Sequence, residues 1–184
     1  QDLGIPELVL MENAGYHAFR IWLDLSSPEE SGPVVACAGS GNNGGDALVM
    51  ARWCQNRGVP IRVVLAKREL KGAVEAQRGV LEAMGLELLH WPEDAARDAI
   101  RDARWIFDGV AGTGIKGALR GTSLELAEAI AESSARVVAI DVPSGVGDEF
   151  APGDPSVTAE VTVTMGLRKR SLYLPATRPL AGRI

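Results

Sequence analysis

The chain has 184 residues, a length that fits one domain with a sizeable core. Hydrophobic residues make up 46% and charged residues 23% of it, as in an ordinary globular protein, and the net charge is −5. This acidic balance argues against a nucleic-acid-binding surface, and no apolar run approaches the roughly 20 residues that cross a bilayer. We therefore expect a cytoplasmic protein that binds neither nucleic acid nor a membrane.

Hydrophobic spacing predicts helices and strands that alternate along the chain. Helices are predicted over residues 6–24, 45–56, 71–84, 92–101 and 123–133. Strands are predicted over residues 34–38, 61–66, 86–89, 105–107, 137–140 and 161–164. This alternation predicts an α/β fold, a Rossmann-like three-layer α/β/α sandwich with a mostly parallel sheet, and the continuously apolar strands agree with it. The first helix carries Phe19 and Trp22, which serve either an interface or the core.

The two cysteines and two histidines of the chain have structural interpretations. Cys37 and Cys54 fall inside a predicted strand and a predicted helix, where small buried apolar residues are expected, although a disulfide between them stays open. His17 and His90 are far apart, with no cysteine or histidine cluster near either. We therefore expect no transition-metal site.

The most informative stretch is the glycine-dense turn Gly39–Asp46, between a predicted strand and a predicted helix. Glycines let backbone N–H groups approach a ligand closely, and the dipole of the following helix favours negative charge. Two asparagines and an aspartate within the turn are unusual for a plain phosphate loop. Their oxygens suit sugar hydroxyls or a hard cation.

Two more strands end in unusual loops, Asp108–Gly117 and Asp141–Gly145. Parallel topology places all three loops at the carboxyl edge of the sheet, where ligands bind in such folds. Each loop alone has a structural explanation, because glycines serve tight turns and aspartates cap helices. Their convergence predicts a functional cleft.

An ordinary dinucleotide fingerprint is only partly present. Residues 39–44 match Gly-x-Gly-x-x-Gly, but Lys67 and Arg68 follow the second strand where an acidic ribose ligand is expected. No Gly-Lys-Ser/Thr follows the glycines, which excludes a P-loop. An NAD-dependent oxidoreductase is therefore disfavoured.

The combined motifs resemble the NAD(P)H-hydrate epimerase family, the YjeF N-terminal domain. The matching pieces run in order along nearly the whole chain: residues 4–6, 10–15, 41–46, Asp108 with 112–114, 141–145 and 162–166. The resemblance implies a Rossmann-like enzyme, an isomerase that interconverts the R and S forms of hydrated NADH and NADPH. A companion dehydratase then restores the S form to usable cofactor.

The resemblance also implies the site residues. Substrate contacts are expected from Asn42, Asn43, Gly44, Gly45, Asp46, Gly112, Thr113, Gly114, Ile115, Lys116, Gly117, Ala118 and Asp141. The potassium (K+) ligands are expected to be Asn43, Asp108 and Ser144. One carboxylate with neutral oxygens suits a monovalent cation better than a divalent one.

Inversion at the hydrated carbon requires an acid/base group and a negative environment for a cationic intermediate. Asp141, at a strand end, is the preferred catalytic residue. Asp46 and Asp108 are weaker candidates, because a helix N-terminus and a cation are expected to hold them as fixed anions. Lys67 or Lys71 lies where the family resemblance places a functional lysine, and a solvated surface role is open for each.

The resemblance also bears on organisation. Residues 1–184 are expected to form a single epimerase domain, trimmed at both ends relative to the family, and either fused to a dehydratase or acting with one. It further implies a homodimer. A non-catalytic scaffold domain of the same fold is the main alternative, and the presence of the site residues favours an enzyme over it.

Overall fold

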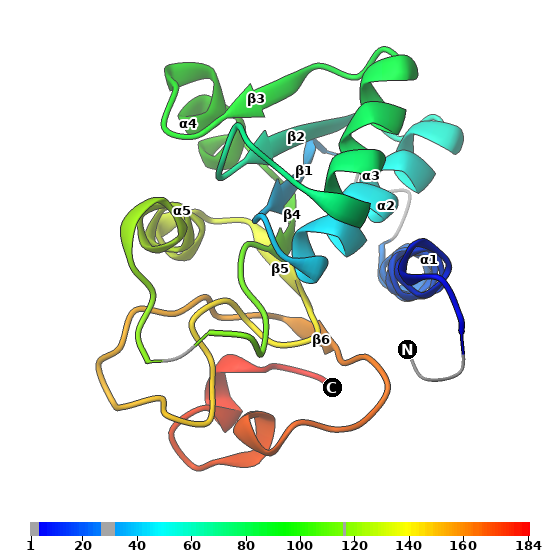
Figure 1. Ribbon diagram of the computed structural model, residues 1–184. Helices are drawn as coiled ribbons and strands as arrows, with labels where there is room; N and C mark the ends of the chain where they lie inside the picture. Colours follow the sequence, from blue (N-terminus) through cyan, green and yellow to red (C-terminus); the bar gives the residue numbers. More distant parts are fainter. Residues whose placement is uncertain (1–3, 27–31, 116) are drawn as a thin grey trace.

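The computed structural model describes residues 4–26, 32–115 and 117–184. Its six strands form one parallel sheet in the order β3-β2-β1-β4-β5-β6 (Figure 1). The strands are β1 (Val34–Ala38), β2 (Ile61–Leu65), β3 (Leu88–His90), β4 (Trp105–Gly109), β5 (Arg136–Ile140) and β6 (Val161–Val163). The helices are α1 (Glu7–Leu25), α2 (Asn42–Asn56), α3 (Gly72–Ala83), α4 (Asp94–Arg101) and α5 (Gly121–Glu132), with short 3-10 turns at Arg170–Tyr173 and Arg178–Leu180. The predicted α/β sandwich is confirmed.

Helices cover both faces of the sheet, as expected for parallel strands. Helices α1, α2 and α3 lie on one face, and α4 and α5 lie on the other (Figure 1). The α1 side holds the aromatic core, in which Trp22 packs edge-on against Phe107 with ring centroids 5.1 Å apart. Phe19 is fully buried in the same cluster. Phe19 and Trp22 of the first helix therefore serve the core.

The sheet has its topological switch point between β1 and β4. These strands are neighbours, with Cys37 opposite Asp108 and Ala38 opposite Gly109. From β1 the chain crosses to β2 over one face, and from β4 it crosses to β5 over the other. In open parallel sheets, ligands bind at the carboxyl ends of strands beside such a point.

Helix α2 begins at Asn42, three residues earlier than predicted. Gly41 has extended backbone, and its carbonyl accepts the Gly44 N–H at 2.9 Å, which closes the first turn. The sequence obscured this start because asparagine and glycine are weak helix formers. As a result, Asn42 and Asn43 belong to a helix N-terminus and not to a free loop.

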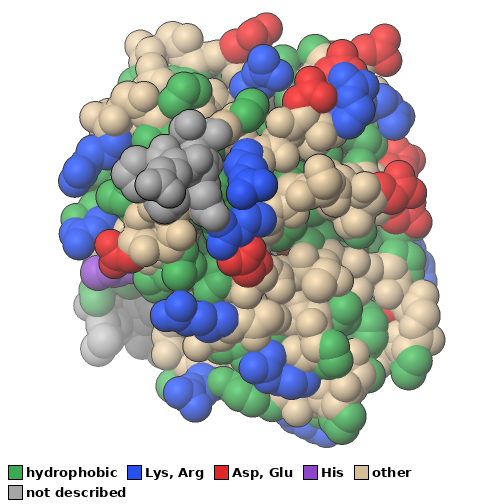
Figure 2. Space-filling view, turned by 180° about the vertical axis from the view of Figure 1, so that it is seen from behind, with side chains coloured by type: hydrophobic (Ala, Val, Ile, Leu, Met, Phe, Trp, Pro, Cys, Tyr) green, Lys and Arg blue, Asp and Glu red, His purple; other side chains and the backbone are tan. Residues whose placement is uncertain are grey.

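The face drawn in Figure 2 carries side chains of every kind. On the face drawn in Figure 2, basic side chains lie among acidic, apolar and uncharged ones. Within the described ranges, no helix is long and apolar enough to cross a bilayer. Cys37 and Cys54 are both buried free thiols.

Candidate active site at the carboxyl edge of the sheet

The three strand-end loops meet, as predicted, and are joined by hydrogen bonds. The Asn43 side-chain amide donates to the Ile140 carbonyl at 2.6 Å, which links the first loop to the end of β5. The Ser144 N–H and hydroxyl donate to the two oxygens of Asp108, at 2.8 and 2.5 Å. The Ala111 N–H donates to the Ser144 hydroxyl at 2.8 Å. Side-chain bonds of Asp108 and Ser144 therefore join the second and third loops, and Asn43 joins the first loop to the end of β5.

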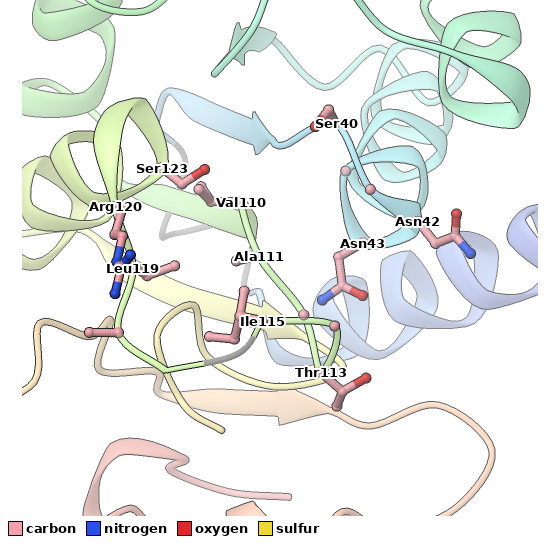
Figure 3. Close-up of a pocket in the computed structure, with 15 residues that line it drawn as sticks. Ser40, Asn42, Asn43, Val110, Ala111, Thr113, Ile115, Leu119, Arg120 and Ser123 are labelled. Atoms are coloured by element: carbon pink, nitrogen blue, oxygen red, sulfur yellow. The ribbon is translucent and has the colours of Figure 1, made fainter. Parts of the chain in front are cut away.

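A cavity of about 620 Å³ opens between the first two of these loops and the start of α5 (Figure 3). Eight of the predicted substrate residues line it: Asn42, Asn43, Gly44, Gly112, Thr113, Gly114, Ile115 and Ala118. The remaining lining residues come from both rims and were not predicted: Ser40, Gly41, Val110, Ala111, Leu119, Arg120 and Ser123. The glycine turn and the second loop thus form opposite walls of one cavity.

The other predicted substrate residues lie elsewhere. Gly45 faces α1, where a Cβ atom would lie 2.3 Å from the Met11 Cε, so its role is close helix packing. The Gly117 N–H donates to the Glu149 carboxylate at 3.1 Å and does not line the cavity. Lys116 lies outside the described residues. The structure thus places eight of the predicted residues at the cavity wall and Gly45 and Gly117 away from it.

The N-terminus of α2 forms part of the cavity wall. Its N-cap residue, Gly41, makes no side-chain capping bond. The N–H groups of Gly44 and Gly45 bond to the Gly41 carbonyl, whereas the first N–H groups of a helix have no acceptor within it. The free N–H groups of Asn42 and Asn43, together with the helix dipole, favour an anionic group at this wall.

Asp108 lies under the cavity, fully buried. Burial raises the pKa of Asp108 to about 6, against the hydrogen bonds from Ser144 and from the Val110 N–H at 3.3 Å, which lower it. No lysine or arginine of the described residues forms an ion pair with this carboxylate. Neither Asp108 nor Asp141 caps a helix, so the helix-cap alternative is excluded for both.

Asp46 lies at a second, smaller cavity of about 170 Å³ on the α1 side. This cavity also contacts Asn42, which lines the larger one too, and its apolar lining comes from Leu10, Met11, Ala14 and Met165. Burial and, to a lesser extent, the charge of Asp141 raise the pKa of Asp46 to about 7. Desolvation therefore opposes the expected stabilisation of a fixed Asp46 anion by the helix N-terminus.

Asp141 follows β5 with a φ of +66°, a left-handed conformation that is uncommon outside glycine. It lines neither cavity, but its Oδ1 atom accepts the N–H of Met165, a lining residue of the smaller cavity, at 3.0 Å. The Lys169 ammonium forms an ion pair with the same carboxylate. Lys67 and Lys71, the lysines singled out in the sequence, are exposed and line neither cavity.

Sequence reasoning missed Lys169, although a signal was present. Lys169 follows β6, and the carboxyl end of this strand lies at the same edge as the other loops. If the end of every parallel strand had been treated as part of the site, residues 164–169 would have been among the candidate site residues.

Gly112 packs against Asn43, which gives a stability prediction. A Cβ atom on Gly112 would lie 2.6 Å from the Asn43 amide, whereas one on Gly114 would meet nothing within 4 Å. We expect Gly112→Ala to lower the free energy of unfolding by about 2 kcal/mol, because the Asn43 side chain must move. Gly114→Ala, the matched control, should change it by less than about 0.5 kcal/mol. Equal urea denaturation midpoints for the two variants would contradict this account.

The raised pKa of Asp46 predicts a pH-dependent stability. The folded protein holds the Asp46 proton up to about pH 7, but the unfolded chain releases it near the ordinary value of 3.8. The bound proton therefore stabilises the folded state fully below the unfolded pKa, and this stabilisation is lost as pH rises through 7. We expect Asp46→Asn to gain stability over the wild-type protein between pH 4 and 8, by up to about 4 kcal/mol.

The measurement is urea unfolding of both proteins across this pH range. Asp148→Asn, at an exposed carboxylate, is the control and should follow the wild-type profile. A constant difference between Asp46→Asn and the wild-type protein would show that Asp46 does not titrate on folding.

The strand order, the switch point and the glycine-rich cavity define a Rossmann-like α/β protein with a cavity at the carboxyl edge of its sheet. The family described as YjeF-related protein N-terminus matches residues 7–171, and the chain belongs to this family. A crystal structure of yeast ynu0 (YNL200c) has the same fold, with a TM-score of 0.77 at 24% identity over 89% of this chain and 72% of that one.

Curated relatives span the chain at moderate identity. The chain is 36% identical to the NAD(P)H-hydrate epimerase of Rhodopirellula baltica over 92% of its own length and 69% of that protein. It is 33% identical to the epimerase of Limosilactobacillus reuteri, over 99% of its length and 84% of that protein. It also matches the bifunctional NAD(P)H-hydrate repair enzyme Nnr of Coxiella burnetii at 34% identity, but spans only 37% of that enzyme.

Proposed function

We propose that this chain is an isomerase that interconverts the R and S forms of hydrated NADH and NADPH. The observation that carries the proposal is the large cavity, one wall of which is the glycine turn and the other of which includes Gly112, Thr113 and Gly114 of the family motif. Relatives named NAD(P)H-hydrate epimerase, which match the chain over at least 92% of its length, support it. A scaffold domain would not need Asp108, Asp141 and Ser144 at this edge.

The two cavities suggest how a hydrated dinucleotide lies in the site. Its pyrophosphate would lie at the uncapped N-terminus of α2, in the larger cavity. Its hydrated nicotinamide ring would enter the smaller cavity, where Met11 and Met165 offer apolar contact and Asp46 a polar group. Asn42 lines both cavities, so the substrate would pass over this residue.

The inversion requires loss of hydroxide and return of water on the other face of the ring. The ring nitrogen supplies the electron pair that expels hydroxide, which gives an iminium ion. A protonated carboxyl group would donate a proton to the leaving hydroxyl, and the resulting carboxylate would take one from the incoming water. We assign this role to Asp141, with Asp46 as the second candidate because it exchanges protons near neutral pH. Their negative charge would stabilise the iminium ion.

The residues proposed for potassium fit a monovalent cation. Asp108 is a buried carboxylate with a raised pKa and no ion-pair partner in the described ranges, which indicates missing positive charge nearby. Asn43 uses its Nδ2 for the Ile140 carbonyl, which leaves its Oδ1 available as a ligand. Asp108, Asn43 and Ser144 would hold K+, which would supply positive charge beside the substrate pyrophosphate. No three acidic, histidine or cysteine side chains cluster as a divalent site within the described part of the chain.

The wider setting of the enzyme is also proposed. Bifunctional relatives suggest that the chain acts with a dehydratase, either fused to it or separate. Residues 1–184 would act as one catalytic domain. The homodimer and the cytoplasmic location stay predictions from the family resemblance.

A coupled assay tests the proposed activity. A mixture of R- and S-hydrated NADH is treated with an S-specific dehydratase in potassium buffer, with and without this protein, and the spontaneous rate is subtracted. We expect rapid recovery of the R fraction as NADH. Recovery of the S fraction alone would overturn the proposal and favour a binding or scaffold domain.

A further inference from the structure

The loop after β6 holds the Asp141 carboxylate by one of its two oxygens. Oδ1 accepts the Met165 N–H at 3.0 Å and the Thr164 hydroxyl at 3.4 Å, and it pairs with the Lys169 ammonium. Across the described part of the chain, Oδ2 accepts no hydrogen bond. The carboxylate is thus fixed at one oxygen and free at the other.

Lys169 itself is held in place by the same loop. Its ammonium also donates to the Met165 carbonyl, four residues earlier. The side-chain exposures of Lys169 and Asp141 are 22% and 11%, so water screens this pair less than a surface ion pair. Lys169 further lines a hollow of about 380 Å³ together with Thr113 and Ile115 of the glycine loop. The lysine therefore contacts both Asp141 and a hollow that it shares with two residues of the large cavity.

The charge around Asp141 makes this lysine important. Asp46, on α2, is close enough for its charge to interact with that of Asp141. Two like charges that interact disfavour each other, and a nearby cation offsets this repulsion. Among the described residues, Lys169 is the one cation that forms an ion pair with either carboxylate.

We propose that Lys169 is a positioning residue for epimerisation, whose ammonium anchors Asp141 through Oδ1 and leaves Oδ2 for proton transfer. The inference rests on the proposed function. Lys169 does not touch the substrate in this role, so its loss should affect turnover and not binding. A misplaced acid/base group of this kind costs about 10²-fold in rate.

The test compares Lys169→Met, Lys169→Arg and Arg168→Met in the coupled epimerase assay. We expect Lys169→Met to lower kcat about 10²-fold with KM within about twofold. Lys169→Arg keeps the positive charge and should restore most of kcat. Arg168, an exposed neighbour with no contact to Asp141, is the matched control, and its variant should behave as the wild-type protein.

Two results would overturn the inference. One is a Lys169→Met variant with wild-type kcat. The other is an equal loss of kcat, binding and melting temperature in both Lys169 variants, which would show a structural role only. If the wild-type protein itself fails to epimerise, the proposed function fails. If the wild-type protein and Lys169→Met epimerise equally well, the proposed function stands and only the role of Lys169 is overturned.

Discussion

Asp141→Asn is expected to lower the epimerisation rate about 10²- to 10⁴-fold while leaving dinucleotide binding intact. An amide cannot exchange the proton that the departing hydroxyl and the incoming water require. Asparagine is the suitable replacement, because it tolerates the left-handed backbone that residue 141 adopts at φ +66°. The rate is measured by dehydratase-coupled recovery of NADH, and binding by calorimetry with an unreactive dinucleotide.

Asp148→Asn is the control for this variant. It removes a carboxylate from an exposed position of the following loop, and we expect it to epimerise at the wild-type rate. Undiminished epimerisation by Asp141→Asn, with intact binding, would sink the assignment of Asp141 and leave Asp46 as the candidate.

Removal of potassium should have the second largest effect. We expect the wild-type protein to lose about 2 kcal/mol of stability when tetramethylammonium replaces K+ at equal ionic strength, because the charge of buried Asp108 is then uncompensated. Asp108→Asn should be less stable in both buffers, since a neutral amide is a poorer acceptor for the two Ser144 donors. Its melting temperature should no longer respond to K+.

Comparing the two proteins in the two buffers separates the effect of K+ bound at Asp108 from a general effect of salt. A general salt effect would shift both melting temperatures equally. Equal responses of the wild-type protein and Asp108→Asn to K+ would contradict a potassium site at this carboxylate, and so would no response in either protein.

The sheet and the convergence of its loops were predictable from sequence. Buried parallel strands are short apolar runs, so Val34–Ala38 was predicted at its exact bounds. The alternation of elements then fixes the parallel topology, which brings the ends of β1, β4 and β5 to one edge. The hydrogen bonds between Asp108 and Ser144, and between Asn43 and the Ile140 carbonyl, lie at that edge.

Other features depend on three-dimensional packing and were missed. The start of α2 at Asn42 was hidden by weak helix formers, whose conformation the neighbouring loops fix. The pKa of Asp46 depends on burial beneath α1, which the spacing of the sequence does not reveal. Lys169 reaches Asp141 across 28 positions of the chain, a contact that no local pattern predicts.

The most direct measurement starts from a single purified epimer. R-hydrated NADH is incubated with the protein in potassium buffer, and the two epimers are separated by chromatography over time. The proposed function predicts that the S epimer forms far faster than in buffer alone and that both reach the same final ratio. Formation of the S epimer at the spontaneous rate would contradict it.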